Sequence, residues 1–193
     1  MSNKSMDWDQ LATDWDSNPE YQQRAKAAFR SILGHFGAVK GSHVLDIGCG
    51  TGLLTELLSE HAKSLVALDP SEAMIEQLEL KELKHVEPVV DTLTRGLVAM
   101  HPAFEKQFDL ITANSVLIYI NNLSEVADIA LTLLNKRGYF MAWDIIETEE
   151  VMDYTVRVKS VLNAVGFSGV SVTESVQYDL DSGRKLMMSI AQK

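Results

Sequence analysis

The sequence predicts an α/β fold with a single doubly wound, mostly parallel sheet and helices on both of its faces. Short apolar runs of strand length alternate along the chain with longer segments whose apolar residues recur at helical spacing. Alternating strands and helices form a parallel sheet with right-handed crossovers. Four predicted strands also end at a polar residue, namely Asp46, Asp69, Asp91 and Asn114. Because ligands of open α/β sheets bind past the carboxyl ends of the strands, these residues predict where a site lies.

Capping residues, prolines and glycines mark ends of several predicted helices. Asn18 caps the first long helix, Pro19 occupies its first position and Gly37 ends it. A weaker helix over 93–101 is interrupted by Gly96. The other predicted helices cover residues 52–61, 71–83, 124–135 and 149–165.

Seven strands are predicted, at residues 43–47, 64–68, 85–90, 108–113, 139–143, 170–178 and 185–192. Pro88 cannot donate a ladder hydrogen bond, so its strand is expected at an edge of the sheet. The turn signal Asp181-Ser182-Gly183 indicates that the last two strands are antiparallel.

Composition limits the class of protein and its partners. The chain has 193 residues, which suits one domain, and a formal net charge of −10. This acidity argues against a nucleic-acid partner, because phosphate backbones are bound by clustered Lys and Arg. The single cysteine, Cys49, and the lack of a basic segment followed by an apolar one predict a cytoplasmic protein. No apolar run approaches the ~20 residues of a membrane span. The five histidines lack ligand spacing, so no metal is expected.

The stretch His43–Gly52 joins a predicted strand, a glycine-rich turn and a helix start. Glycine can adopt positive φ and let a ligand approach the backbone closely at Gly50, and the amides at the helix start favour a ligand with an anionic end. A dinucleotide site has the spacing G-x-G-x-x-G, whereas the spacing here is G-x-G-x-G, with Asp46 two positions before the first glycine. A carboxylate at Asp46 repels a pyrophosphate and attracts an ammonium group. The motif therefore favours a nucleoside that bears an amino acid, and disfavours an NAD-dependent dehydrogenase.

The stretch Val44–Gly52 resembles the first motif of the class I S-adenosylmethionine-dependent methyltransferases, and the resemblance extends to about Trp143 with looser flanks. It implies the strand order 3-2-1-4-5-7-6 with strand seven antiparallel, in agreement with the edge position that Pro88 predicts. It also implies S-adenosyl-L-methionine as cofactor and S-adenosyl-L-homocysteine as product. We divide the single domain 1–193 into an N-terminal helical lid (1–37), a cofactor-binding core (43–145) and a C-terminal helix and strand pair (146–193).

The resemblance assigns the cofactor contacts to several strand ends. Asp69 lies 19 positions after Gly50, where family members bind the ribose hydroxyls; its alternative is a helix-entry aspartate. Asp91 with Thr92 falls where the family contacts the adenine amino group, and a loop aspartate is the alternative. Met74 occupies a position that often packs on the adenine ring, and ordinary core is the alternative.

The predicted cofactor set also includes residues of the lid and of the turn. Arg24 can bind the methionine carboxylate through two parallel hydrogen bonds, or can be a surface arginine on an amphipathic helix. Cys49 is expected to be a small turn residue, because no base is in evidence that would make it a nucleophile. The complete predicted cofactor set is Arg24, Asp46, Gly48, Cys49, Gly50, Asp69, Pro70, Met74, Asp91, Thr92 and Asn114.

The expected function is methyl transfer to a small-molecule acceptor. Methyl transfer from a sulfonium is an in-line displacement that needs alignment and exclusion of water, so the sequence identifies no catalytic residue. Residues 108–120 lack the N/D-P-P-Y signature of amino-group methyltransferases that act on nucleic acids, which argues against such substrates. The predicted substrate pocket consists of Trp8, Trp15, Tyr21, Tyr119 and Trp143, of which the tryptophans can alternatively belong to the core. The alternatives are transfer of another group from an S-adenosyl ligand and a non-catalytic S-adenosylmethionine-binding protein. The acceptor and the oligomeric state are not specified by the sequence.

Overall fold

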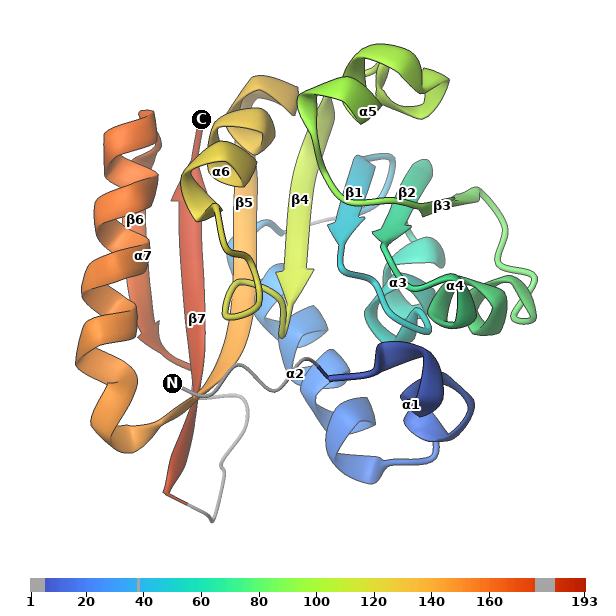
Figure 1. The fold of residues 1–193 in the computed structure, drawn as a ribbon. Coiled ribbons are helices and arrows are strands. Elements are labelled where there is room, and N and C mark those ends of the chain that lie inside the picture. Colours follow the sequence, from blue (N-terminus) through green and yellow to red (C-terminus); the bar gives the residue numbers. More distant parts are fainter. Residues whose placement is uncertain (1–5, 38, 176–182) are drawn as a thin grey trace.

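One seven-stranded sheet runs through the molecule in the order β3-β2-β1-β4-β5-β7-β6 (Figure 1). The computed structural model describes residues 6–37, 39–175 and 183–193. Strands β1 to β5 pair in parallel, and β7 is antiparallel to both β5 and β6. This order and the antiparallel seventh strand confirm the predicted fold. The strands are β1 (His43–Ile47), β2 (Ser64–Asp69), β3 (Val86–Val90), β4 (Phe108–Asn114), β5 (Leu134–Glu147), β6 (Ser168–Glu174) and β7 (Arg184–Gln192).

Helices cover both faces of the sheet, because the parallel strands carry apolar side chains on both sides. In β1, Leu45 and Ile47 belong to a core shared with α6 and α7, whereas Val44 belongs to a core shared with α2, α3 and α4 (Figure 1). The helices are α1 (Trp8–Trp15), α2 (Pro19–His35), α3 (Leu53–Ser59), α4 (Glu72–Glu79), α5 (Arg95–Met100), α6 (Leu123–Leu133) and α7 (Val151–Val165), with short 3₁₀ turns η1 (Pro102–Phe104) and η2 (Thr148–Glu150).

Capping residues fix the helix starts that point toward the carboxyl ends of the strands. The Asn18 side chain accepts the amide of Glu20 at 2.9 Å, with Pro19 at the first helical position, as predicted. The Ser71 hydroxyl accepts the amide of Met74 at 3.1 Å. These caps satisfy amides that have no partner within the helix.

The structure departs from the prediction mainly in the second half of the chain. Strand β5 is much longer than the predicted 139–143, because it continues to Glu147 by pairing with β7. In place of the predicted helix over 93–101, the structure has the shorter α5, which Thr94 caps, and then the 3₁₀ turn η1. The last three residues of the predicted strand 170–178 lie outside the described residues, as do residues 181–182 of the predicted turn. Strand β3 pairs with β2 alone, so the edge position predicted from Pro88 is confirmed.

The carboxyl ends of β1, β2 and β4 come together beneath α1, with the start of α2 alongside (Figure 1). Within the part of the chain that the structure describes, no helix combines the length and the apolar character needed to cross a membrane.

Candidate active site

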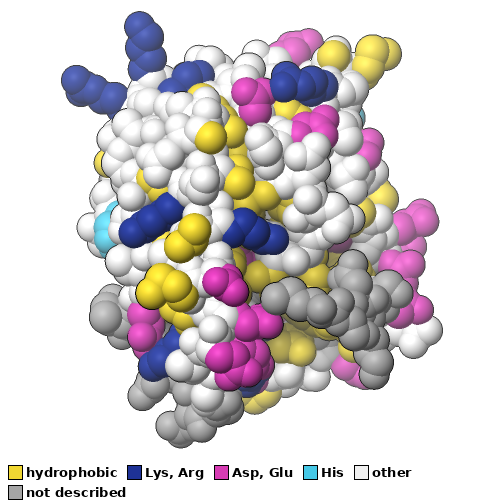
Figure 2. Space-filling model, turned by 60° about the vertical axis from the view of Figure 1, so that its left-hand side comes forward, with side chains coloured by type: hydrophobic (Ala, Val, Ile, Leu, Met, Phe, Trp, Pro, Cys, Tyr) yellow, Lys and Arg dark blue, Asp and Glu magenta, His cyan; other side chains and the backbone are white. Residues whose placement is uncertain are grey.

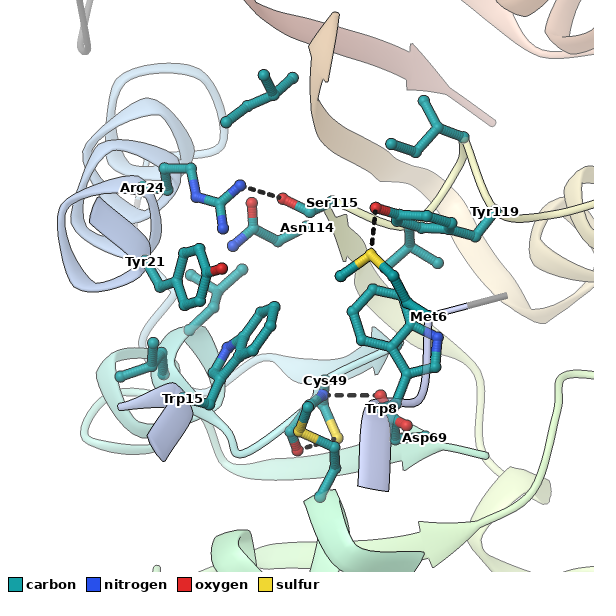
Figure 3. Close-up of a pocket in the computed structure, with 18 of the residues that line it drawn as sticks. Met6, Trp8, Trp15, Tyr21, Arg24, Cys49, Asp69, Asn114, Ser115 and Tyr119 are labelled. Atoms are coloured by element: carbon teal, nitrogen blue, oxygen red, sulfur yellow. Dashed lines mark hydrogen bonds between the residues drawn. The ribbon is translucent and has the colours of Figure 1, made fainter. Parts of the chain in front are cut away.

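A cavity of about 430 Å³ opens at the carboxyl ends of the strands (Figure 3). Its lining comes from the N-terminal segment, the glycine turn after β1, the end of β2 with the start of α4, the loop after β4, and the facing ends of β5 and β7. The predicted site residues that line it are Trp8, Trp15, Tyr21, Arg24, Asp46, Gly48, Cys49, Gly50, Asp69, Pro70, Met74, Asn114 and Tyr119. The structure therefore brings most of both predicted sets to one space.

The glycine turn adopts the left-handed conformation that the motif predicts. Gly48, Gly50 and Gly52 have φ values of 64°, 55° and 86°. A Cβ on Gly50 would meet only the Met74 sulfur, at 3.8 Å, so protein atoms leave room there, whereas a Cβ on Gly48 would lie 2.4 Å from a methyl of Val116. Gly50 thus faces open cavity, and Gly48 is required by packing.

The amides of this turn are used within the protein. Gly48 and Cys49 donate to the carbonyl of Leu68 at 2.7 and 3.1 Å, and Gly50 donates to the Asp69 carboxylate at 2.8 Å. These three amides are therefore not free to bind a ligand, and the expectation of an anionic ligand end, which concerns the amides at the helix start, stays a prediction. Their partners lie on β2, so the hydrogen bonds instead fix the turn to the neighbouring strand.

Asp46 lies beneath the turn as a buried acid. Its two carboxylate oxygens accept hydrogen bonds from the hydroxyls of Thr55 and Thr112, both at 2.7 Å, and the residue is 1% exposed. Burial raises the pKa of Asp46 to about 6, against the opposing effect of the two hydroxyls, and the Asp69 charge raises it further. These hydroxyls occupy two of the roughly four acceptor positions of the carboxylate, whose charge also acts on the cavity through its electric field.

Asp69 connects the turn to α4. One oxygen accepts the Gly50 amide at 2.8 Å and the other accepts the Ser71 amide at 2.9 Å. The helix-entry role is therefore present, and because a carboxylate has about four acceptor positions, two remain for a ligand. Burial raises the pKa of Asp69, while these amides lower it and the charge of Asp9 raises it. Burial, together with the charges of Asp46 and Asp69, raises the pKa of the Cys49 thiol, so Cys49 is protonated.

Four aromatic rings form a connected wall on the other side of the cavity (Figure 3). Trp8 meets Tyr119 edge to face at a centroid distance of 5.0 Å and meets Trp15 at 5.9 Å. Trp15 stacks on Tyr21 at 4.0 Å. The Tyr119 hydroxyl donates to the Met6 sulfur at 3.7 Å. Burial and the charge of Asp144 raise the pKa of Tyr119, so it is a neutral phenol at physiological pH.

Two polar side chains, Arg24 and Asn114, line the cavity between the glycine turn and the aromatic wall. The Arg24 guanidinium is buried, with its carbon 4.5 Å from the centre of the Tyr21 ring, and it donates to the Ser115 hydroxyl at 3.4 Å. The Oδ1 of Asn114, at the end of β4, is buried without a hydrogen-bond partner among the described residues. A buried amide oxygen that lacks a partner costs free energy until a donor reaches it.

Comparison with known proteins identifies the family. A family model described as a methyltransferase domain matches residues 20–154, more than half of the chain. The chain belongs to the class I S-adenosylmethionine-dependent methyltransferases. The family that the glycine motif predicts is confirmed.

The curated relatives of this methyltransferase domain are named for different reactions. The ubiquinone biosynthesis O-methyltransferase of Pseudomonas entomophila is 32% identical over 91 residues, which cover 46% of this chain and 38% of that protein. The tRNA U34 carboxymethyltransferase of Pseudoalteromonas translucida is 25% identical over 197 residues, which cover 91% of this chain and 58% of that protein. The chain thus spans less than two thirds of the length of the curated relatives that it matches.

Solved structures share the fold of the methyltransferase domain. The N-methyltransferase NodS from Bradyrhizobium japonicum, in complex with S-adenosyl-L-homocysteine, superposes with a TM-score of 0.70 at 20% identity. The superposition covers 95% of this chain and 90% of that one.

Three predicted site residues of the methyltransferase domain do not line the cavity. Trp143 is completely buried in the core between the sheet and α2, so its prediction as a wall of the substrate pocket is wrong. Its side chain points from β5 toward the α2 face. Asp91 and Thr92 follow β3 as exposed residues, and Asp91 accepts the amide of Thr92 at 2.7 Å. This local hydrogen bond is the one expected of the loop aspartate named as the alternative.

The prediction missed the cavity residues that arrive from distant segments. Ile145 and Glu147 lie at the end of β5 and Arg184 lies at the start of β7, where it pairs with Glu20 of α2 at 3.7 Å. The antiparallel register of β5 and β7 brings these residues together, because it pairs Glu147 with Arg184, and β5 and β7 are far apart in the sequence. Among the described residues, no group of three His, Cys, Asp or Glu side chains comes together as a metal site would require.

Proposed function

We propose that this domain binds S-adenosyl-L-methionine in the cavity and transfers the methyl group to a small acceptor. The continuity of the cavity carries the proposal, because one space joins the glycine turn and Asp69 to the aromatic wall. We assign the adenosine to the side formed by Gly50, Asp69 and Met74, and the methionine carboxylate to Arg24. A guanidinium buried beside an aromatic ring is well suited to hold a carboxylate.

The protein contributes alignment and exclusion of water to this reaction. The S-adenosylmethionine sulfonium supplies an activated methyl group. The rings of Trp8 and Tyr119 close the cavity on the acceptor side, which favours approach of the acceptor in line with the leaving sulfur. Tyr119 is a neutral phenol, so its role is to orient the acceptor through a hydrogen bond, and not to act as a base.

We infer that the N-terminal segment, as far as it is described from residue 6 to 37, acts as the lid of this site. Helix α1 is fixed to the cofactor side by polar contacts at both ends. The Ser71 hydroxyl donates to Asp9 at 2.5 Å, and Asp16 accepts the Thr51 hydroxyl and pairs with Lys81 at 2.7 Å. These contacts place the lid's tryptophans over the cavity.

A small acceptor is favoured over a nucleic acid. The cavity has the size of a small-ligand pocket, and α1 at its mouth carries or adjoins four acids: Asp7, Asp9, Asp14 and Asp16. Acids at this mouth repel a phosphate backbone. Figure 2 shows one face of the molecule, on which several acidic side chains lie close together in the lower half. The aromatic wall favours a planar acceptor, since aromatic rings prefer offset or edge-to-face contact with one another.

A second candidate is transfer of a group other than methyl from a related S-adenosyl ligand. The observation in its favour is the similarity to a tRNA carboxymethyltransferase over 91% of the chain. The two candidates share Asp69 and Gly50. They are distinguished by incubating the domain and a panel of phenols, amines and heterocycles with S-adenosylmethionine in one arm and with its S-carboxymethyl analogue in the other, and by measuring the mass that the acceptor gains in each arm. A binding protein without activity would give no modified acceptor in that panel.

The cofactor assignment is tested by Asp69→Ala, with Asp109→Ala as the matched control. Both carboxylates accept two hydrogen bonds, but Asp109 lies at the amino ends of the strands, where it accepts the His43 amide and the Asn135 side chain. S-adenosylhomocysteine should bind wild type and the control, as measured by calorimetry, and should bind Asp69→Ala about 1.5–3 kcal/mol more weakly. NAD should bind none of them. Wild-type binding of NAD without S-adenosylhomocysteine would contradict the proposal.

A further inference from the structure

The loop between β4 and α6 carries the acceptor side of the cavity. Ser115, at φ 64°, begins the loop, and its amide donates to the carbonyl of Trp143 at 2.5 Å. The Tyr119 amide then donates to Val116 at 2.9 Å, which closes a tight turn. The turn brings the Tyr119 ring over the cavity against Trp8 (Figure 3).

The underside of this loop is held by a buried carboxylate. Asp144 of β5 is completely buried, and its Oδ1 accepts the Ile118 amide at 3.4 Å, with the Leu117 amide also donating to the carboxylate. Its Oδ2 accepts the Tyr154 hydroxyl of α7 at 2.8 Å, and that hydroxyl lies 3.5 Å from the Ser189 hydroxyl of β7. One side chain therefore connects the loop, α7 and the sheet.

An arginine holds the same peptide unit from the other side. Arg157 of α7 donates from Nη2 to the carbonyl of Leu117 at 2.9 Å. The peptide unit between Leu117 and Ile118 thus has its amide bound by a carboxylate and its carbonyl bound by a guanidinium. Both are charge-assisted hydrogen bonds, which are stronger than those between neutral groups.

Core stability alone does not account for an aspartate at this position. The neighbours of Asp144 on the same face of β5 are Phe140, Ala142 and Ile146, all buried and apolar. Burying a carboxylate among apolar side chains carries a desolvation cost, and apolar replacements of buried charges are often neutral or stabilising. Departures from the local apolar pattern of a strand are expected where a side chain serves the site.

We propose that Asp144 and Arg157 are positioning residues that fix the loop 115–122 and thereby set where Tyr119 stands against the acceptor. The pair touches neither the cavity nor any reacting atom and acts through the backbone of Leu117 and Ile118. The inference rests on the proposed function only in that Tyr119 faces the acceptor.

Hydrogen exchange of the whole chain tests the proposal, with peptides that cover residues 115–122 followed by mass spectrometry. Asp144→Asn keeps the shape of the side chain and removes its charge. Arg157→Met keeps the length of the side chain and removes the donor. Each should speed exchange of the loop amides roughly tenfold, as expected for the loss of one charge-assisted hydrogen bond. Arg157→Lys, which keeps a charged donor, should restore most of the protection.

The control separates loop positioning from a general loss of stability. Asp109→Asn also removes the charge of a carboxylate that accepts a backbone amide, but this carboxylate lies at the amino ends of the strands. It should leave exchange of the loop unchanged, whereas Asp144→Asn should speed it without lowering the urea midpoint. Wild-type exchange in both Asp144→Asn and Arg157→Met would overturn the proposal. Equal acceleration in Asp109→Asn would overturn it as well.

S-adenosylhomocysteine affinity, measured on the same proteins, keeps the two proposals apart. It should stay within about threefold of wild type in Asp144→Asn and Arg157→Met, since neither residue lines the cofactor side. If wild type fails to bind S-adenosylhomocysteine, the proposed function is contradicted and the exchange result still decides the role of Asp144. If binding persists while loop exchange is unchanged in the variants, only the positioning role is contradicted.

Discussion

The two sides of the cavity are built in different ways. The cofactor side comes mostly from one continuous stretch, in which β1, the glycine turn and the end of β2 are joined by backbone hydrogen bonds from Gly48 and Cys49 to Leu68. The acceptor side is assembled from separate segments, with Trp8 from α1, Tyr119 from the β4–α6 loop and Arg184 from β7. A side held by local backbone contacts can be recognised in a sequence. A side assembled from distant segments depends on the packing of the whole domain.

The largest effect is expected where the two sides touch. Gly48→Ala places a Cβ 2.4 Å from a Val116 methyl at φ 64°, whereas Gly50→Ala at φ 55° meets only the Met74 sulfur at 3.8 Å. We expect a loss of unfolding free energy of roughly 2–5 kcal/mol for Gly48→Ala, from strain plus overpacking, and of about 1–2 kcal/mol for Gly50→Ala, from strain alone. Urea unfolding measures both.

The double variant Gly48→Ala with Val116→Ala sharpens this test. If the contact with Val116 causes the difference, the double variant should lose less stability than the sum of the two single variants. Simple additivity would show that the two sides are not coupled at Gly48.

An effect of intermediate size is expected from the buried acid of each side. Asp46 on the cofactor side and Asp144 on the acceptor side each have a pKa raised from 3.8 to about 6, primarily by burial. Between these values the folded protein binds more protons than the unfolded chain, so the stabilising contribution is present at low pH and is lost as pH rises to about 6. The loss is on the order of 2–3 kcal/mol for each acid.

Urea unfolding at pH 4.5, 5.5 and 7.5 measures this dependence. Asp46→Asn and Asp144→Asn remove the titrating group, so each should become more stable relative to wild type as the pH rises. A stability difference between variant and wild type that stays constant over this range would contradict the raised pKa.

The smallest effect is expected in the aromatic wall. Trp8→Leu removes edge-to-face contacts with Trp15 and Tyr119, and we expect a loss of about 1 kcal/mol of unfolding free energy. Tyr119→Phe keeps its ring and should stay within about 0.5 kcal/mol of wild type. If Trp8→Leu loses as much unfolding free energy as Gly48→Ala, the acceptor side is as essential to the fold as the glycine turn.

What the sequence predicts follows the same division. The glycine turn and the edge position of Pro88 are local signals, and each corresponds to what the structure places there. Asp69 is a local signal as well: it lines the cavity as predicted, and its contact with the ribose stays a prediction. Trp143 was predicted from its position at a strand end, but its face depends on the register of β5 with β4 and β7, which turns the ring into the core. Asp144 interrupts the apolar pattern of its strand, but the sequence does not identify its partner, because Tyr154 lies on a later helix and meets it only when α7 packs on the sheet.

The protonated state of Cys49 has a consequence for a domain that stores an alkylating reagent. A thiolate is a strong nucleophile, whereas a thiol is a weak one. Burial and the charges of Asp46 and Asp69 keep the cysteine in the cavity wall as a thiol. Burial, together with the carboxylates that favour a cationic methyl donor, therefore also disfavours methylation of Cys49.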